Sequence, residues 1–476
     1  MEQKSIATYS KLFKIDEIRD SKLLQIVFYV ITFSFFTTFF SWASLRIISI
    51  SYFLKGYHVC PPYFQSCGDY YFLEAQPYGY TQGLFYVLLF LLLGYGVISA
   101  LRKDWVSAHM TMLVALIWKF IFLYFFTYGF GGNYDYYDMV LAIVWLFLRH
   151  KEYFLKVAFV MFYFIASTVK IHEGWILGNF FTATITGAPF FSNDMLPVFT
   201  NIVILMQMVG CWFLLSNNKT YQRLAFFYFF LFHMYSGVIV HYRYISISIT
   251  ALVVLFGYNF KLFHIDEARD KKLFKVLKIS KETFAGYFLM ILILISQSVG
   301  FLIQGDQKKT LEGNFYGLYM FEANHQCIST PTITYKDGTS KVVISGSHFA
   351  KARCDPYRYW YPLKTLCVRD TKIKSIAWTF DHSINGHAYQ RIVSEENVCK
   401  LSYNSLKHNQ WIKIGSEAKD VSTPVYKNGY ASDLYPESYV IPTSPTSVEK
   451  STIIEVIYTS IWVATLLVCI FMVINA

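Results

Sequence analysis

Charged residues are scarce in this sequence. Asp, Glu, Lys and Arg make up 15% of its 476 residues, whereas hydrophobic residues make up 55% and aromatic residues 20%. Because a soluble globular chain carries about 25% charged residues, this composition argues for a membrane protein. It also excludes a disordered chain, a collagen-like repeat and a small disulfide scaffold.

Several catalytic and metal-binding motifs are missing as well. Residues 305–450, the one sizeable polar segment, contain no nucleophile elbow, no HExxH sequence and no phosphate-binding loop. The cysteines form no CxxC pair and have no Cys/His spacing typical of zinc ligands. We therefore expect no bound metal, and these absences exclude the commonest motif-bearing hydrolases and nucleotide-binding proteins.

Long apolar runs dominate the rest of the chain. A membrane-spanning helix needs roughly 20 apolar residues. Ten segments meet or approach this length, near 23–45, 81–101, 107–128, 134–149, 152–170, 195–216, 222–240, 244–260, 283–304 and 452–474. We therefore predict an all-α polytopic membrane bundle of about ten transmembrane helices.

The distribution of positive charge predicts an orientation for this bundle. With the N-terminus inside, 19 Lys and Arg residues lie in inner segments, and only Arg46, Lys55, Lys170 and Arg243 lie in short outer loops. This is the positive-inside pattern. The net charge of +11 then indicates topology and attraction to membrane lipid, and nucleic acid is not expected as a partner.

The predicted organisation has three parts. Residues 1–304 form a transmembrane domain, residues 305–450 a small, mostly β, extracytoplasmic domain, and residues 451–476 a C-terminal transmembrane helix. Both termini are expected in the cytoplasm, and we expect a bacterial inner membrane rather than the endoplasmic reticulum.

Cysteine usage agrees with this orientation. Six of the eight cysteines fall in segments predicted to lie outside: Cys60, Cys67, Cys327, Cys354, Cys367 and Cys399. Thiols confined to one side are typical of disulfides in an oxidising compartment. Six cysteines allow 15 pairings, and the sequence does not choose among them.

Two turn signals support strands in the extracytoplasmic domain. Lys336-Asp337-Gly338 separates β-rich residues 332–335 from 340–344, and Asn385-Gly386 separates 375–380 from 387–393. Asp-Gly and Asn-Gly between such runs are strong hairpin signals.

An internal repeat links the two halves of the helical region. Residues 11–23 read KLFKIDEIRDSKL and residues 261–273 read KLFHIDEARDKKL, with ten identical positions of thirteen. In each copy an Asp and an Arg at i,i+3 could pair, as Asp16 and Arg19 do in the first. Either the copies are two helices lying in the lipid headgroup layer, or they form a matched pair that docks a partner or each other.

Three ionisable residues fall inside predicted spans. Lys119 lies in the middle of the third span, Asp138 near the start of the fourth and His233 in the middle of the seventh. Charged groups inside a bilayer are costly and are functional candidates. Lys119 requires either a carboxylate partner, for which Asp138 is a candidate, or a water-filled cavity, whereas His233 is either catalytic or hydrogen-bonded between helices.

A fourth polar group lies at the outer end of the fifth span. Lys170 is followed by His172, Glu173 and Trp175. The lysine is either an interfacial residue that reaches into the headgroup layer beside an aromatic anchor, or a reactive group. Burial disfavours the protonated form of an amine, so Lys170 could act as a base near neutral pH.

Residues 159–178, FVMFYFIASTVKIHEGWILG, resemble the signature of the vitamin K-dependent gamma-glutamyl carboxylases and of the wider HTTM (horizontally transferred transmembrane) superfamily. The shared pattern is an aromatic-rich span, a small residue, a lysine, a polar stretch, a tryptophan and a glycine, here Ala166, Lys170, His172-Glu173, Trp175 and Gly178. Phe232-His233 and residues 133–136 resemble two further family segments.

The resemblance implies a carboxylase-like enzyme. In that family the lysine matching Lys170 deprotonates reduced vitamin K. Oxygen addition then gives a strong base that removes a γ-proton from a substrate glutamate, and carbon dioxide captures the resulting carbanion. The cofactor would be reduced vitamin K or another quinol, and the substrate an exported peptide or protein. The implied catalytic residues are Lys170 and His233, with a pocket shaped by Asn133, Tyr134, Lys119, Asp138, His172, Glu173 and Trp175.

A second hypothesis stays open because the sequence departs from the carboxylases. Tyr134 stands where they carry a histidine, and residues 305–450 replace their larger propeptide-binding domain. The alternative is a non-enzymatic HTTM maturation, immunity or assembly factor that binds a secreted polypeptide.

Overall fold

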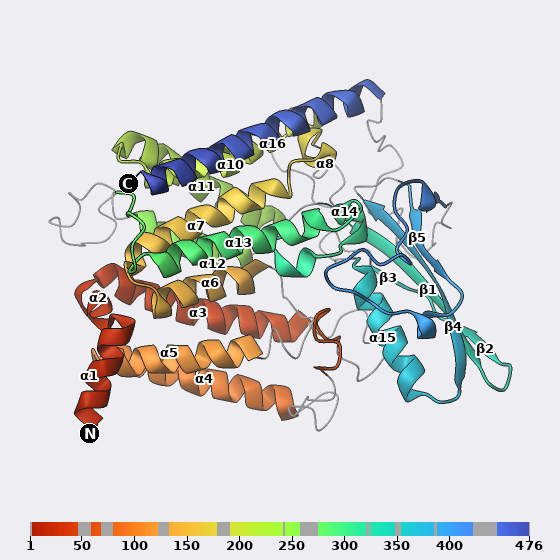
Figure 1. Ribbon diagram of the computed structural model, residues 1–476, viewed down its shortest axis with the longest axis horizontal. Helices are drawn as coiled ribbons and strands as arrows, with labels where there is room; N and C mark the ends of the chain where they lie inside the picture. Colours follow the sequence, from red (N-terminus) through yellow and green to blue (C-terminus); the bar gives the residue numbers. More distant parts are fainter. Residues whose placement is uncertain are drawn as a thin grey trace.

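The computed structural model describes residues 2–45, 59–67, 80–121, 133–178, 191–240, 243–257, 275–319, 323, 325–347, 354–384, 388–421 and 445–475. It shows a group of helices lying side by side and a β-sheet at one end of them (Figure 1). We call these the helical part and the sheet domain, the latter comprising the described residues of 305–421 and the loop 59–67.

The helices of the helical part lie roughly parallel or antiparallel to one another, except α1 and α2, which lie across one end (Figure 1). Their bounds are α1 Glu2–Phe13, α2 Ile15–Asp20, α3 Lys22–Leu45, α4 Tyr80–Leu101, α5 Trp105–Phe120, α6 Asn133–Phe147, α7 Lys151–Thr168, α8 Glu173–Ile176, α10 Leu196–Met208, α11 Lys219–Val240, α12 Arg243–Phe256, α13 Phe284–Leu302 and α16 Pro445–Ile474. Short 3-10 turns precede and follow α10, at Asn193–Met195 and Gly210–Leu215.

The prediction of about ten membrane spans is wrong. Each predicted segment contains a helix, but among the described residues only Phe284–Leu302 and Ser451–Ile474 are long and apolar enough to cross a membrane. Three of the other segments are shorter than predicted or irregular. α6 and α12 have 15 and 14 residues, below the length a bilayer requires, and the 195–216 segment leaves the α-helix after Met208.

The sheet domain contains antiparallel strands in the order β2-β1-β4-β5-β6, with β3 also paired to β1. Their bounds are β1 His325–Tyr335, β2 Ser340–Val342, β3 Ser345–Ser347, β4 Ile373–Ile384, β5 Gln390–Glu395 and β6 Lys419–Asp420. Helix α15, Pro356–Arg369, packs on this sheet through a core that includes Tyr357, Trp360, Leu363, Ile376, Trp378 and Phe380. The mostly β prediction missed this helix, whose start is marked by Asp355, which accepts a hydrogen bond from Tyr357 N at 2.9 Å, followed by proline.

Both predicted hairpins are present as strand pairs. Thr334 pairs with Ser340 across β1 and β2, and Gly338 has a φ of +87°, which glycine adopts readily. β4 and β5 also pair antiparallel, although Asn385 and Gly386 lie outside the described residues.

The prediction that the six cysteines form disulfides is confirmed. The bonds join Cys60 to Cys67, Cys327 to Cys354 and Cys367 to Cys399, whereas Cys211 and Cys469 are free. The loop 59–67 packs against the sheet domain, since the Tyr357 hydroxyl donates to Cys60 O at 2.8 Å and the Tyr361 hydroxyl to Gln65 O at 2.9 Å. All three disulfides therefore belong to one compact region.

The first copy of the repeat is docked into the protein. Ile15 and Ile18 are fully buried. Glu17 accepts hydrogen bonds from the backbone N–H groups of His150 (3.2 Å) and Lys151 (3.0 Å), at the start of α7. This copy is therefore a structural clamp on α7, and the Asp16–Arg19 pair forms at its surface. The second copy, 261–273, lies outside the described residues.

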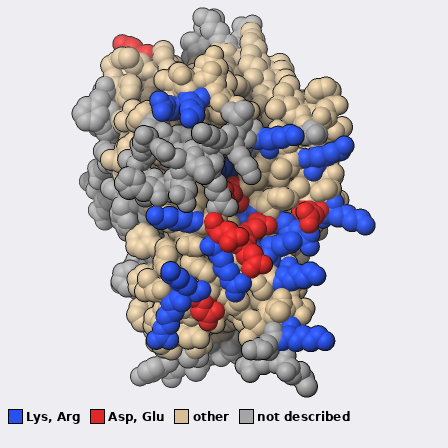
Figure 2. Space-filling model, turned by 90° about the vertical axis from the view of Figure 1, so that its left-hand side faces the viewer, with Lys and Arg blue, Asp and Glu red and all other residues tan. Residues whose placement is uncertain are grey.

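The end of the helical part opposite the sheet domain carries many charged side chains. Figure 2 shows Lys and Arg spread over this end, with Asp and Glu grouped near its centre. Arg149 pairs with Glu282 there. This end of the helical part is therefore a charged surface (Figure 2).

Candidate functional site

Lys170 lies just beyond the end of α7 and is 1% exposed. The last carbonyl groups of a helix have no partner within it, and side chains satisfy them here. Lys170 Nζ donates to Ala166 O at 2.9 Å, and Trp462 Nε1 donates to Phe164 O at 3.1 Å. Lys170 is thus a buried amine at a helix C-terminus, a position that favours cations.

The segment after Lys170 supplies an aromatic wall. Trp175, in the short helix α8, is buried, and its ring centre lies 5.3 Å from Lys170 Nζ. His172 is also buried, and its Nδ1 accepts a hydrogen bond from Gly174 N at 3.1 Å, which starts α8. The signature segment therefore folds so that its lysine and tryptophan face each other.

Charged side chains from two distant segments, residues 306–308 and helix α16, approach this segment. Asp306 follows α13 and pairs with Lys308 at 3.1 Å. Burial acts to raise the pKa of Asp306, but the charge and hydrogen bonds of Lys308 outweigh it, and His172 adds to the effect, so the pKa is lowered. Glu455 of α16 lies within electrostatic range of Glu173, Asp306 and Lys308. The Lys170 segment thus borders a polar junction next to the sheet domain.

His233 is fully buried on α11 and contacts α7, the helix that ends two residues before Lys170. Its Nε2 is hydrogen-bonded to the Tyr163 hydroxyl at 2.5 Å, and the Tyr163 ring stacks on Phe229 with 4.1 Å between ring centres. Tyr163 precedes Lys170 by seven residues, which is two helical turns or about 10 Å along the axis. His233 therefore lies deeper in the helical part than Lys170.

Lys119 and Asp138 form the ion pair considered from the sequence. Lys119 Nζ lies 2.6 Å from Asp138 Oδ2 and 2.9 Å from Asp135 Oδ1, and all three side chains are buried. Ser34 donates to Asp138 at 3.2 Å, and the Phe35 ring lies 4.4 Å from the amine. Sequence reasoning missed Asp135, although its i,i+3 spacing to Asp138 puts both carboxylates on one helix face.

Two of the predicted pocket residues cannot be placed in this way. Asn133 and Tyr134 are the first residues of α6, and their side chains lie outside the described part of the chain. Their contribution to a pocket stays a prediction.

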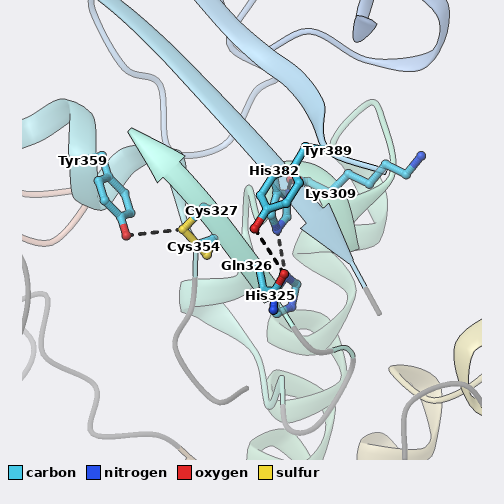
Figure 3. The surroundings of a disulfide bond; sticks show 8 residues. All are labelled: Lys309, His325, Gln326, Cys327, Cys354, Tyr359, His382 and Tyr389. Atoms are coloured by element: carbon cyan, nitrogen blue, oxygen red, sulfur yellow. Dashed lines mark hydrogen bonds between the residues drawn. A yellow bond between two sulfur atoms is a disulfide. The ribbon is translucent and has the colours of Figure 1, made fainter. Parts of the chain in front are cut away.

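A buried histidine pair that the sequence did not indicate lies beside a disulfide (Figure 3). His325 Nδ1 and His382 Nε2 are 3.0 Å apart, and His382 Nδ1 is 3.0 Å from Lys309 O. The carbonyl can only accept, so His382 Nδ1 carries a proton and Nε2 accepts from His325. Burial and the neighbouring His325 hold the pKa of His382 well below its ordinary value.

These arrangements allow proton chemistry at a buried amine, and they do not assemble a metal centre. Within the described residues no group of three or more His, Cys, Asp or Glu side chains could hold a metal ion. The sequence-predicted residues divide into two clusters, Lys119 with Asp138, and Lys170 with His172, Glu173 and Trp175, while His233 joins the second through α7.

Comparison with protein-family models, with curated proteins and with solved structures found no match.

Proposed function

We propose that this protein is a carboxylase-like membrane enzyme in which Lys170 acts as a base toward a quinol and an exported peptide or protein is modified. The observation that carries the proposal is the burial of the Lys170 amine against Trp175, where the helical part meets the disulfide-bonded sheet domain. The family resemblance of residues 159–178 supplies the reaction class.

Two helices that could each span a membrane support this proposal. The two helices long and apolar enough to cross a membrane, α13 and α16, flank the sheet domain in sequence and run in opposite directions (Figure 1). Large apolar side chains are exposed on several helices, including Phe90, Leu91, Leu224, Leu231, Leu292, Ile295, Leu467 and Phe471. Such surfaces suit lipid contact, and the disulfides suit an extracytoplasmic sheet domain.

The burial of Lys170 suits a base that works away from water. Enclosure also protects a strongly basic intermediate from quenching by solvent. The adjoining Asp306, Lys308 and Glu455 would lie on the side from which a polar peptide arrives.

The residues present fit a quinol. Trp175 could stack on a flat ring and Lys170 Nζ could accept a proton from a ring hydroxyl. However, the amine lies over the Trp175 ring and both side chains are buried, so they would have to separate to admit the quinol. When bound, a reduced quinone with dioxygen would supply the strong base that carboxylation of glutamate requires. Lys170 would take the hydroxyl proton, Trp175 would orient the ring, and His233 with Tyr163 would support the helix below.

The proposal is tested with purified protein in nanodiscs, reduced vitamin K, labelled bicarbonate and glutamate-containing exported peptides. We expect label to enter the peptide as a new carboxyl group, and Lys170→Ala to reduce the rate by about 100-fold or more, as loss of a general base does. Lys170→Arg should fail as well, because arginine stays protonated. Lys281→Ala, an exposed lysine at the other end, is the matched control. Full activity of a folded Lys170→Ala protein would end the enzyme proposal.

A second candidate function is a non-enzymatic factor that binds a secreted polypeptide. The hydrogen bond from Lys170 to Ala166 O favours it, because a lysine that caps a helix needs no chemistry. In that case the sheet domain would be the binding element, and Lys170→Arg would retain function because arginine can also donate to the carbonyl.

A further inference from the structure

Gln297 is a buried amide in the middle of an otherwise apolar helix. It lies on α13 and is 3% exposed. A polar side chain in such a helix costs free energy unless its groups are hydrogen-bonded. Gln297 makes bonds in two directions, and these bonds explain its presence.

One direction leads to the end of α7. Gln297 Nε2 donates to Thr168 Oγ1 at 3.1 Å, and Thr168 in turn donates to Ile165 O at 2.6 Å. Thr168 is the last residue of α7, two positions before Lys170. The amide of Gln297 therefore holds the turn from which the Lys170 amine extends.

The other direction leads to residues 306–319, which precede β1 and which we call the linker of the sheet domain. Leu318 N donates to Gln297 Oε1 at 2.7 Å, and the Tyr319 hydroxyl donates to Gln297 O at 3.1 Å. Both Leu318 and Tyr319 are buried, and β1 begins six residues later. One side chain thus connects the linker of the sheet domain to α7.

Glycines allow the linker to lie this close to α13. A Cβ at Gly317 would lie 2.9 Å from Gln297 Oε1, and one at Gly300 would lie 2.3 Å from the Tyr319 hydroxyl. Gly313 has a φ of +77°, and its Cβ would lie 2.7 Å from Gly300 Cα. Contacts this short exclude a side chain, so the linker is built to rest against this part of α13.

We infer that Gln297 is a positioning residue through which the linker of the sheet domain holds the end of α7, and with it the Lys170 amine. Binding of a polypeptide to the sheet domain would then change the position of the Lys170 amine through Gln297. The effect of polypeptide binding on the reaction at Lys170 rests on the proposed function, but the hydrogen-bonded connection through Gln297 does not, and the two can be tested separately.

The test compares Gln297→Met with Gln297→Glu in the full-length protein in nanodiscs. Methionine keeps the length but loses both bonds, whereas glutamate can still accept from Leu318 N and loses only the bond to Thr168 Oγ1, whose own hydrogen is donated to Ile165 O. The readouts are amide hydrogen exchange at residues 169–172 and the rate at which an acylating reagent labels Lys170, located by mass spectrometry. We expect Gln297→Met to raise both by about tenfold or more, because two hydrogen bonds are lost, and Gln297→Glu, which keeps the bond from Leu318 N, to raise them by a smaller factor.

Two further variants keep the outcome decisive. Gln207→Met removes another buried glutamine from an apolar helix, α10, and should leave residues 169–172 unchanged. Thr168→Val removes the other end of the bond and decides the matter if Gln297→Met does not fold. Unchanged exchange and labelling in Thr168→Val and Gln297→Met, or an equal effect of Gln207→Met, would overturn the inference. Absence of carboxylation in the wild type would remove the proposed function and leave these measurements standing.

Discussion

Lys119, Asp135 and Asp138 form a buried charge cluster between α5 and α6. The position of Lys119 within an apolar run required a carboxylate partner, and Asp138 is that partner. The second carboxylate, Asp135, is not predicted, because hydropathy locates a helix but does not show which of its faces lies against a neighbouring helix. Lys170 was located for the same reason, but its bond to Ala166 O depends on where α7 ends, which apolar periodicity does not determine.

Replacing Lys119 by methionine should destabilise the protein strongly. The change leaves Asp135 and Asp138 buried without their cation, which costs about 3–5 kcal/mol. Thermal unfolding in detergent, followed by tryptophan fluorescence, measures the loss. The triple variant Lys119→Met, Asp135→Asn, Asp138→Asn should recover most of it. A loss no greater than that of Arg19→Ala, which breaks the exposed pair with Asp16, would show that the buried cluster contributes little.

Elements follow the sequence pattern where one face alone is buried. The alternation of β1 and the Asp-Gly turn predicted a hairpin that the structure contains. α15 was not predicted, because Pro362 and its many aromatic residues obscure the helical pattern of residues 356–369. The repeat at 11–23 shows the opposite limit, since charged residues such as Glu17 are usually solvated, yet here one caps a distant helix.

The histidine pair joins strands β1 and β4 to the linker at Lys309, and it should make the protein sensitive to acid. His382 stays neutral when folded, whereas an unfolded histidine takes up a proton below a pKa of about 6.5. Because the unfolded state then binds more protons, stability is retained above this pH and falls as the pH drops below it, by up to about 1.4 kcal/mol per pH unit.

The midpoint of thermal unfolding between pH 7.5 and pH 5 measures this effect. His382→Gln should flatten the decline, whereas His150→Gln, at an exposed site at the other end of the molecule, should not. An identical slope in wild type and His382→Gln would contradict the assignment of a neutral buried His382.

At the scale of the whole molecule, composition predicted membrane association and a disulfide-bonded domain, and it overestimated the number of spans. Apolar runs register both lipid-facing and protein-buried helices, so hydropathy counts segments such as α7, whose residues are almost all buried in protein, together with α13 and α16. Lys and Arg side chains are nevertheless numerous at the end opposite the sheet domain (Figure 2).

Topology can be measured with single cysteines and a membrane-impermeant maleimide on intact cells. Asp337→Cys, at the exposed tip of the β1–β2 hairpin, should be labelled, whereas Lys103→Cys, exposed after α4, should be labelled only after the cells are permeabilised. The native free cysteines, one buried and one partly buried in helices, set the background. Labelling of both sites, or of neither, in intact cells would refute an extracytoplasmic sheet domain opposite a cytoplasmic charged end.

The attachment of the loop 59–67 to α15 has a consequence for biogenesis. The partners Cys60 and Tyr357 are 297 positions apart in the chain. A ribosome therefore delivers the small Cys60–Cys67 ring long before the surface that receives it exists. During that interval the Cys60–Cys67 disulfide can form, but the loop 59–67 can pack against α15 only after the later half of the chain has been translated. Maturation is thus ordered in time, with an early local oxidation followed by a late docking event.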